Sequence, residues 1–326
     1  MLKEFLKNII KSCLPLIDFV LLPLTFIAAI YLKLLRRLGV HRLPLARTTF
    51  NGVGVFPIRD HYYEPLFNPK HLRKSLNDDR DLPGIDFNIS EQLDLLSKFK
   101  YNSELEAIPL DKTNKLQFYY NNDSFLSGDA EFLYNVIRHF KPKKLIEIGS
   151  GMSTLMAASA IQQNNSESST YNCEHICIEP YEKDWLTEID VKLERKLVEN
   201  IDKNLFSSLS ENDILFIDSS HIIRPQGDVL FEYLEILPIL NKGVIVHIHD
   251  IFTPKDYPND WVIDKVYLWN EQYLLEAFLS GNSNFKIIGA LNFLKHHYPE
   301  ELSNCCPILK QQIKNREPGS FWIEKN

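Results

Sequence analysis

The sequence has no excess of positive charge and no even set of cysteines. Its 326 residues carry a formal net charge of -7, whereas a protein that binds nucleic acid needs a basic surface to hold phosphate groups. The five cysteines are an odd, unevenly spread set, unlike the even sets that cross-link small secreted domains. We therefore expect no nucleic-acid partner and a reducing compartment.

Zinc-site spacing and the signatures of nucleotide-binding loops are also missing. Cys173 and Cys177 flank His175, but no second Cys or His pair follows at the spacing of a structural zinc site, so we interpret these cysteines as structural or incidental. The stretch "EIGSGMST", residues 147–154, has no Lys for a phosphate-cradling Walker loop. Thr154 stands where the dinucleotide fingerprint has its third glycine.

The same turn favours a different ligand. Gly149 and Gly151 permit a tight turn, and the helix expected after them offers free N–H groups and its positive dipole end to an anion. Glu147 would repel a pyrophosphate but favour a ligand ammonium group. The turn therefore predicts a zwitterionic ligand rather than NAD.

The N-terminus carries one long hydrophobic stretch. From Leu14 to Leu32 the only charge is Asp18, and a bilayer is spanned by about 20 apolar residues. Pro15, Pro23 and Asp18 weigh against a lipid-exposed spanning helix, while the basic cluster "KLLRR" directly afterwards weighs against a cleaved signal peptide. We predict membrane anchoring, by spanning or by lying in the interface, over a helix packed on a soluble domain.

The remaining chain divides by composition. We expect an anchor at residues 1–42, a cap on the substrate side at 43–125 and the main domain at 126–326. In the main domain, helix and strand signals alternate, which is typical of a parallel sheet covered on both faces. The predicted helices are 129–140, 153–163, 227–240 and 266–279, and the predicted strands are "KLIEIGS", "HICIEP", "ERKLVENI", "DILFIDSSH", "GVIVHIHDIF", "NFKIIGAL" and "GSFWIEK".

Titratable side chains follow three of these strands. Glu179 ends the second strand, where a carboxylate can accept hydrogen bonds from two ribose hydroxyls. Asp218 and His221 follow the fourth strand, and His249 and Asp250 follow the fifth. Ligands of open parallel sheets bind outside the carboxyl ends of the strands, so we expect these groups to lie together.

Two kinds of chemistry fit that cluster. Asp218, His249 and Asp250 form either a divalent-metal triad or a base with its orienting partners. His247 lies two residues deeper in the strand, and we interpret it as a hydrogen-bonded core histidine.

Taken in order, these motifs resemble class I S-adenosylmethionine-dependent methyltransferases, most closely the small-molecule O-methyltransferases of methyltransferase domain family 24. The resemblance covers about Tyr62 to the C-terminus. It implies an α/β, Rossmann-like, doubly wound and mostly parallel seven-stranded sheet that ends in an antiparallel hairpin, preceded here by the N-terminal hydrophobic helix. It rests on "HYYEPLF", "LIEIGSGMSTL", "CIEP", "DILFIDSSH", "GVIVHIHDIF", "WNEQYLLEAFL" and "GSFWIEK".

The resemblance also implies a cofactor and the residues that hold it. The methionine end of S-adenosylmethionine would lie against Glu147 and the turn of Gly149, Ser150 and Gly151, and its ribose against Glu179. The resemblance also implies that Asp218 contacts the cofactor.

A metal is implied only in some relatives. In metal-dependent members, a carboxylate after the fourth strand and two consecutive ligands after the fifth bind magnesium, and these positions match Asp218, His249 and Asp250. His249 departs from the pattern, because magnesium prefers oxygen ligands. The resemblance therefore leaves open magnesium, a softer divalent ion, or no metal with His249 as general base.

The implied reaction moves a methyl group to a hydroxyl of a small molecule, a glycan or a lipid-linked sugar. His249 or His221 would remove the proton, with Asp250 beside them. Two other functions stay open: a metal-dependent hydrolase or hydroxylase on the same scaffold, and a non-catalytic, membrane-tethered binding module. We expect a membrane-associated protein with a cytoplasmic catalytic domain, since S-adenosylmethionine is made there. The oligomeric state is open, a homo-oligomer included.

Overall fold

A computed structural model describes residues 2–66, 68–113, 115–181 and 183–326. The chain divides into two compact units, Met1–Arg73 and Lys74–Asn326. The segment boundaries predicted at residues 42 and 125 stay a prediction.

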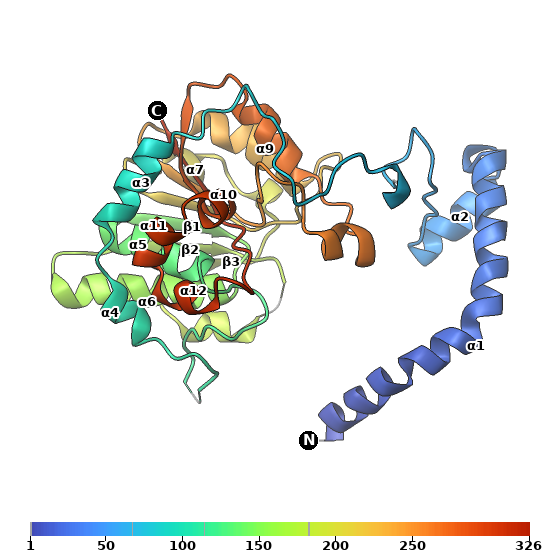
Figure 1. The fold of residues 1–326 in the computed structure, drawn as a ribbon, viewed down its shortest axis with the longest axis horizontal. Coiled ribbons are helices and arrows are strands. Elements are labelled where there is room, and N and C mark those ends of the chain that lie inside the picture. The colour runs from blue at the N-terminus through green and yellow to red at the C-terminus, as the bar shows by residue number, and fades with distance from the viewer. Residues whose placement is uncertain (1, 67, 114, 182) are drawn as a thin grey trace. The chain divides into compact units, whose positions relative to one another are not determined.

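The smaller unit begins with helix α1, Leu2–Leu38, which continues through both prolines (Figure 1). Its segment Cys13–Leu38 is long and apolar enough to cross a membrane, by length and composition, and is not buried within the protein. Gly39 ends the helix with a φ of +90°, a conformation that costs glycine little. The short helix η1, Val40–Arg42, and helix α2, Pro44–Val53, follow. The predicted N-terminal hydrophobic helix is confirmed.

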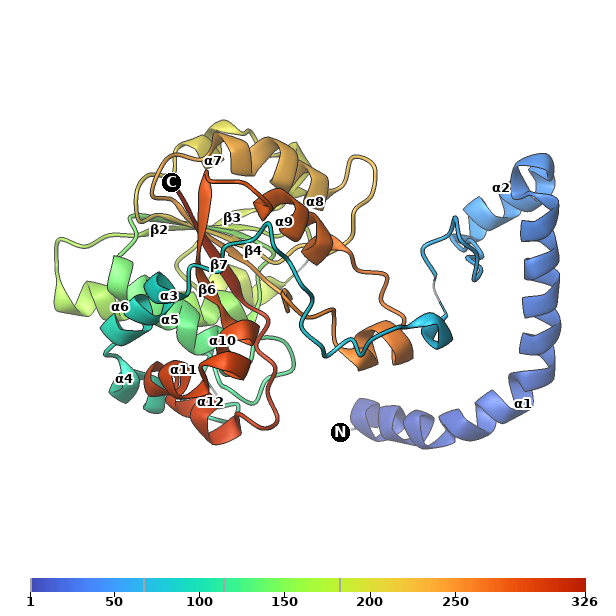
Figure 2. The same ribbon diagram turned by 45° about the horizontal axis from the view of Figure 1, so that its top comes forward.

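The larger unit contains a seven-stranded sheet in the order β3-β2-β1-β4-β5-β7-β6 (Figures 1 and 2). All neighbours from β3 to β5 are parallel, whereas β7 is antiparallel to both β5 and β6. The predicted fold class and the terminal antiparallel hairpin are therefore confirmed. The strands are β1 Lys144–Ile148, β2 Glu174–Ile178, β3 Lys192–Glu194, β4 Ile214–Ile217, β5 Ile245–Ile248, β6 Phe285–Ala290 and β7 Phe321–Lys325.

Successive side chains of the central strands point to opposite faces of the sheet and pack into two separate hydrophobic cores. Leu145 and Phe216 pack with helices α5, Asp129–Phe140, and α6, Met152–Glu167. Their neighbours in sequence pack on the opposite face with helices α7 Asn204–Ser207, α8 Asp228–Phe231 and α9 Glu271–Leu279. Figure 2 shows these two helix layers on opposite sides of the sheet. Because both faces are covered, the central strand β4 is apolar throughout and β5 is apolar at every position except His247.

Two predicted elements differ from the structure. The third strand was expected at residues 194–201, but β3 ends at Glu194 and residues 198–200 form the short helix η4, Val198–Asn200. Its partner β2 ends at Ile178, which pairs with Glu194. The last hydrogen bond between the two strands runs from the Glu179 amide to the Glu194 carbonyl. The helix expected from Val266 begins only at Glu271, since Val266 has a φ of 54°, which a right-handed helix cannot accommodate.

Further helices complete the larger unit. Residues 232–239, which follow α8, stay helical as the π turn η5, Glu232–Ile236, and the 3₁₀ turn η6, Leu237–Ile239, so the predicted range 227–240 is largely filled. The sequence did not predict three helices between β6 and β7. The additional helices are α3 Ile89–Lys98, α4 Asn102–Glu106, α10 Leu291–His297, α11 Pro299–Cys305 and α12 Pro307–Gln312, with the short helix η3 Asp184–Glu188. The short helix η2, Pro69–His71, belongs to the smaller unit.

Candidate functional site

The turn after β1 is shaped by a glycine that no other residue can replace without movement. Gly149 has a φ of +79°, and a Cβ atom there would lie 2.1 Å from the carbonyl oxygen of Asp218. The turn is therefore pressed against the end of β4. At Gly151 a Cβ atom would meet nothing closer than 3.9 Å, and the buried Oγ of Ser150 has no partner among the described residues. The turn thus combines close packing at Gly149 with open space at Gly151.

Glu179 ties the turn to the end of β2. The Ser150 amide donates to its Oε2 at 3.2 Å, and the Tyr181 amide donates to its Oε1 at 2.9 Å. Lys183 Nζ lies 3.1 Å from Oε2 and also donates to the Ser150 carbonyl. The predicted ribose-binding carboxylate therefore lies beside the glycine turn, where a partly exposed lysine now contacts it.

The carboxylate of Glu147 is hydrogen-bonded to neighbouring side chains beneath the glycine turn. It is fully buried, and Ser153 in the first turn of α6 donates to its Oε1 at 2.8 Å. Its Oε2 lies 2.8 Å from His175 Nε2 and 3.5 Å from Cys177 Sγ. The side chain thus supports the start of α6 from beneath, and its predicted contact with the methionine end of the cofactor stays a prediction.

The carboxyl ends of β4 and β5 bring together Asp218, His221 and Asp250. One ligand atom from each lies within 4.8 Å of the others. His221 Nε2 is 3.4 Å from Asp218 Oδ1 and 3.6 Å from Asp250 Oδ2. This cluster adjoins the glycine turn, because Gly149 touches the Asp218 backbone.

His249 lies outside this cluster although it neighbours Asp250. Its Nε2 is 3.6 Å from Asp250 Oδ1, and its ring faces Phe125 with a centroid distance of 5.3 Å. The side chain is buried, and its Nδ1 has no partner among the described residues. Burial lowers the pKa of His249, but the carboxylates of Asp250, Asp218 and Asp129 outweigh burial and raise it. The structure therefore places His221, rather than His249, between the two aspartates.

His221 is held from behind by a residue that the sequence analysis did not assign. Its Nδ1 lies 2.9 Å from Oε2 of Glu271, the first residue of α9. Glu271 is fully buried and also accepts a hydrogen bond from the Tyr233 hydroxyl at 3.2 Å. The His221 carbonyl accepts hydrogen bonds from the amides of Asn270 and Glu271. The start of α9 thus fixes both the main chain and the ring of His221.

The backbone and the charges of the cluster are both unusual. His221 and Asp250 have φ values of 59° and 57°, a conformation that costs a non-glycine residue about 1 kcal/mol or more and is concentrated at functional sites. Burial lowers the pKa of His221, but Asp218, Glu271 and Asp250 outweigh it and raise that pKa. Desolvation raises the pKa of Asp218, yet His249 and His221 lower it to about 2.

His247 is a core residue, as the sequence predicted. It is fully buried, its Nε2 lies 3.0 Å from Ser320 Oγ, and its ring stacks on Phe216 at 3.9 Å. Burial lowers its pKa well below the ordinary range, so it stays neutral.

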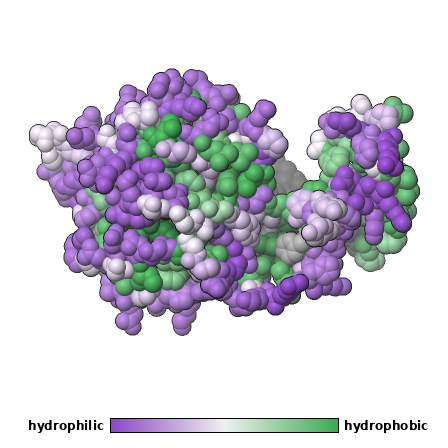
Figure 3. Space-filling view, turned by 90° about the horizontal axis from the view of Figure 1, so that it is seen from above, coloured by the Kyte–Doolittle hydropathy of each residue, from purple (hydrophilic) through white to green (hydrophobic). Residues whose placement is uncertain are grey.

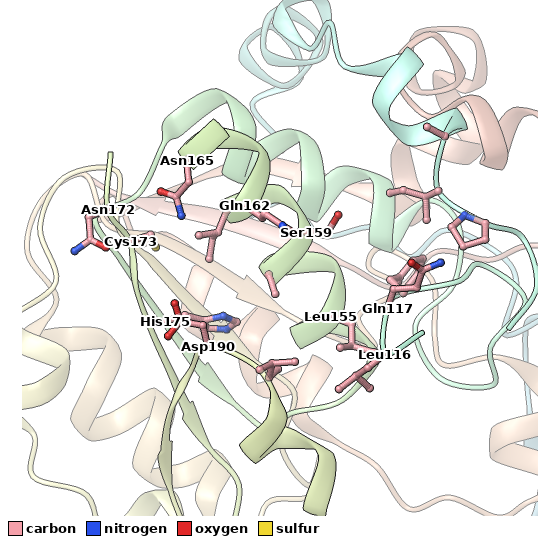
Figure 4. Close-up of a pocket in the computed structure, with 17 residues that line it drawn as sticks. Leu116, Gln117, Leu155, Ser159, Gln162, Asn165, Asn172, Cys173, His175 and Asp190 are labelled. Atoms are coloured by element: carbon pink, nitrogen blue, oxygen red, sulfur yellow. The ribbon is translucent and has the colours of Figure 1, made fainter. Parts of the chain in front are cut away.

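A cavity of about 570 Å³ lies on the α6 side of β2 (Figure 4). Ser159, Gln162 and Asn165 of α6 line it, together with His175 and Asp190 from the strand side. Glu147, His175 and Cys177 form a metal-like group behind this wall. Burial raises the pKa of the Cys177 thiol far above its usual value, and a protonated thiol is a poor metal ligand. We therefore interpret the group as a hydrogen-bonded core.

Comparison with known proteins agrees with this arrangement. Residues 146–251 match the sequence model of a family described as "Methyltransferase domain", a range that contains the glycine turn, Glu179 and the aspartate-histidine cluster. An uncharacterized protein of Archaeoglobus fulgidus is 31% identical over 173 residues, which are 49% of this chain and 76% of that protein.

Solved structures with detectable similarity include two O-methyltransferases. The enzyme from Bacillus cereus, in complex with SAH, is 11% identical, with 73% of this chain and 91% of that chain covered and a TM-score of 0.35. The enzyme TomG from Streptomyces achromogenes, in complex with SAM, is 12% identical, with 71% and 89% covered and a TM-score of 0.34. The match over residues 146–251 identifies this part of the larger unit as a methyltransferase domain, the type found in class I S-adenosylmethionine-dependent methyltransferases.

Proposed function

We propose that the enzyme transfers the methyl group of S-adenosylmethionine to a hydroxyl group, with His221 as the base that takes the hydroxyl proton. One observation carries this proposal. His221 presents Nε2 between Asp218 and Asp250 while Glu271 holds Nδ1 from behind. A base oriented by a buried carboxylate is the arrangement that general-base chemistry requires.

The residues around the glycine turn fit the cofactor. The free N–H groups at the start of α6 favour the cofactor carboxylate, and Gly151 leaves space for it to approach. The ribose hydroxyls would hydrogen-bond to Glu179, displacing Lys183. The bound cofactor would supply the methyl group, and the close approach of Gly149 to the Asp218 backbone supports a cofactor position next to the base.

Proton transfer follows from the hydrogen bonds of His221. The carboxylates around His221 raise its pKa, so we propose that its neutral form, present above that pKa, is the base. In that form Nδ1–H donates a hydrogen bond to Glu271 and the unprotonated Nε2 faces the acceptor. When Nε2 takes the hydroxyl proton, the Glu271 carboxylate stabilises the resulting imidazolium. The positioning of acceptor and donor then contributes most of the remaining acceleration.

A divalent cation would fit beside this base. Asp218 and Asp250 offer carboxylate oxygens, the ligands that hard cations prefer, and a cation there would lower the pKa of the acceptor hydroxyl. His249 lies next to Asp250 but faces Phe125. We propose Asp218 and Asp250 as its ligands, whereas His249, the third ligand expected from the sequence, lies outside the group that these carboxylates form with His221.

We also propose that α1 anchors the protein to a membrane, with the catalytic domain on the cytoplasmic side. Its segment Cys13–Leu38 is apolar and exposed, and Arg36 and Arg37 lie in its last turn. Figure 3 shows apolar side chains of the smaller unit open on its surface. An acceptor carried on a lipid, such as a sugar under assembly, would reach an enzyme held in this way.

Label transfer tests the reaction. Full-length protein is incubated with methyl-labelled S-adenosylmethionine and fractionated cell extract, and labelled products are then treated with alkali. A methyl ether keeps its label, whereas a methyl ester releases labelled methanol. We expect alkali-stable label that requires His221. Methanol release would contradict a hydroxyl acceptor, and cofactor binding without any transfer would favour a binding module.

A further inference from the structure

The end of α1 borders a cavity that the proposed reaction does not use. The cavity has a volume of about 550 Å³ and lies within the smaller unit. The chain makes it by turning at Gly39 and returning through α2. Its polar and aromatic lining consists of Arg36, His41, Arg47, Asn51, Phe56 and Arg59.

The positive charge of this lining is only partly neutralised. Glu64 Oε1 lies 2.7 Å from both Arg36 Nη2 and Arg59 Nε. Burial raises the pKa of Glu64, but its hydrogen bonds with the two arginines outweigh burial and lower it to about 2. Glu64 is therefore ionised at neutral pH. One carboxylate facing three guanidinium groups leaves a surplus of positive charge in the cavity.

Arg36 and Arg47 have N–H donors that no acceptor among the described side chains uses. No carboxylate lies within ion-pair distance of Arg47 among the side chains that the structure describes. The Nε of Arg36 is buried without a partner among the same residues, while its guanidinium stacks on Phe56 at 4.9 Å. An arginine fork of this kind matches the oxygens of a phosphate group better than a lysine does.

The surroundings of the cavity indicate where such a phosphate comes from. The cavity lies at the end of the apolar segment Cys13–Leu38, where basic side chains meet lipid headgroups if the helix enters a bilayer. Apolar side chains lie open at the cavity and next to it in the chain, with Phe56 of the lining 49% exposed and its neighbour Val55 55% exposed. Exposed apolar groups that rim a basic pocket favour a lipid over a freely soluble anion.

We propose that this cavity binds the phosphate of an anionic lipid headgroup. The proposal rests on the membrane anchoring described above and is independent of the acceptor. Arg36, Arg47 and Arg59 would contact the phosphate oxygens, and Glu64 would keep Arg36 and Arg59 in place.

The first measurement establishes the anchor separately. Full-length protein is mixed with phosphatidylcholine vesicles and floated on a density gradient. Flotation of the protein is expected. A protein that stays at the bottom of the gradient would overturn the anchor and, with it, the lipid as the source of phosphate.

The second measurement compares two matched variants in phosphatidylcholine nanodiscs. Arg47→Gln removes a cavity guanidinium, and Arg42→Gln removes the same charge from an exposed arginine of η1 outside the lining. Phosphatidic acid is added and bound lipid is counted by native mass spectrometry. We expect at least a several-fold loss of retained phosphatidic acid for Arg47→Gln and none for Arg42→Gln. Equal losses, or no loss in either variant, would overturn the proposal.

The third measurement separates the lipid from a free phosphate. Inorganic pyrophosphate is titrated into the same nanodiscs by calorimetry, with S-adenosylmethionine binding as the check that each variant is folded. We expect weak binding, because pyrophosphate has no acyl chain to contact the exposed apolar residues. Binding of pyrophosphate as tight as that of phosphatidic acid would overturn the lipid assignment in favour of a soluble phosphate.

Discussion

Nδ1 of His221 lies 2.9 Å from Oε2 of Glu271, although fifty residues separate them in the chain. Glu271 is buried at the start of α9 and the His221 main chain is bound to the same turn. These contacts fix the orientation of the His221 ring, with Nε2 facing Asp218 and Asp250. The proposed chemistry depends on this orientation.

Replacing Glu271 with Gln should slow methyl transfer without weakening cofactor binding. Loss of a carboxylate that orients a functional histidine typically costs roughly ten- to hundredfold in activity. We expect kcat to fall by that order, KM to change little and the pH profile of kcat to shift towards lower pH, because the imidazolium loses its carboxylate partner. Tyr233→Phe, which removes only the second contact to Glu271, is the control and should have a smaller effect. An unchanged pH profile in Glu271→Gln would contradict the positioning role.

Replacing Glu179 with Ala should remove most of the affinity for S-adenosylmethionine. Hydrogen bonds to a charged group contribute about 1.5–3 kcal/mol, so we expect Kd to rise roughly ten- to hundredfold for each ribose bond lost. Calorimetry on the full-length protein measures this change. Glu174→Ala, at the other end of β2 and paired with Lys192, should bind the cofactor like the unmodified protein. Equal affinity in both variants would exclude Glu179 from the cofactor site.

Replacing Gly149 with Ala should destabilise the protein more than the same change at Gly281. Both glycines have positive φ values, +79° and +69°, but only at Gly149 would the new Cβ lie 2.1 Å from a carbonyl oxygen. The conformational penalty alone is about 1–2 kcal/mol, which is the loss expected for Gly281→Ala. Thermal unfolding should show a clearly larger drop in Tm for Gly149→Ala, together with weaker cofactor binding. Similar losses in the two variants would mean that the turn can move away from Asp218.

The stabilising effect of Glu317 should disappear in acid. Its Oε2 lies 2.8 Å from His296 Nε2, and Lys295 contacts the other oxygen. Burial raises the pKa of Glu317, but His296 and Lys295 lower it to about 2. A carboxyl whose pKa is depressed in the folded state stabilises above its unfolded pKa, and this stabilisation is lost as the pH falls through the folded value.

We therefore expect Glu317→Gln to have a lower Tm than the unmodified protein at pH 6, with the gap closing between about pH 4.5 and pH 2. Glu300→Gln, an exposed glutamate on α11, serves as the matched control and should follow the unmodified protein throughout. A gap that stays constant down to pH 2 would show that ionisation of Glu317 is not its source.

Local patterns were enough to predict most of the sheet. The glycine turn, the apolar strands and the polar groups at the ends of β4 and β5 are encoded by short stretches, since strand ends in a parallel sheet meet at one edge. The position of β3 was missed because an edge strand ends where its partner ends, and the partner lies elsewhere in the chain.

The orientation of the two histidines and the role of Glu271 depend on long-range packing, which the sequence alone does not reveal. Both His221 and His249 follow strands and both were predicted as bases, yet only the fold shows that His221 turns towards the carboxylates while His249 turns towards Phe125. Glu271 lies in the first turn of α9 only in the structure, because the helix was predicted to begin five residues earlier. Carboxylates in a first turn are common as helix-stabilising charges, and burial against His221 is a tertiary property.

The most direct test compares His221→Ala with His249→Ala in a single turnover at saturating labelled S-adenosylmethionine. Our account predicts that both variants bind the cofactor, that His221→Ala loses methyl transfer, and that His249→Ala retains a substantial part of it. Transfer abolished in His249→Ala but preserved in His221→Ala would contradict the account and assign the base to His249.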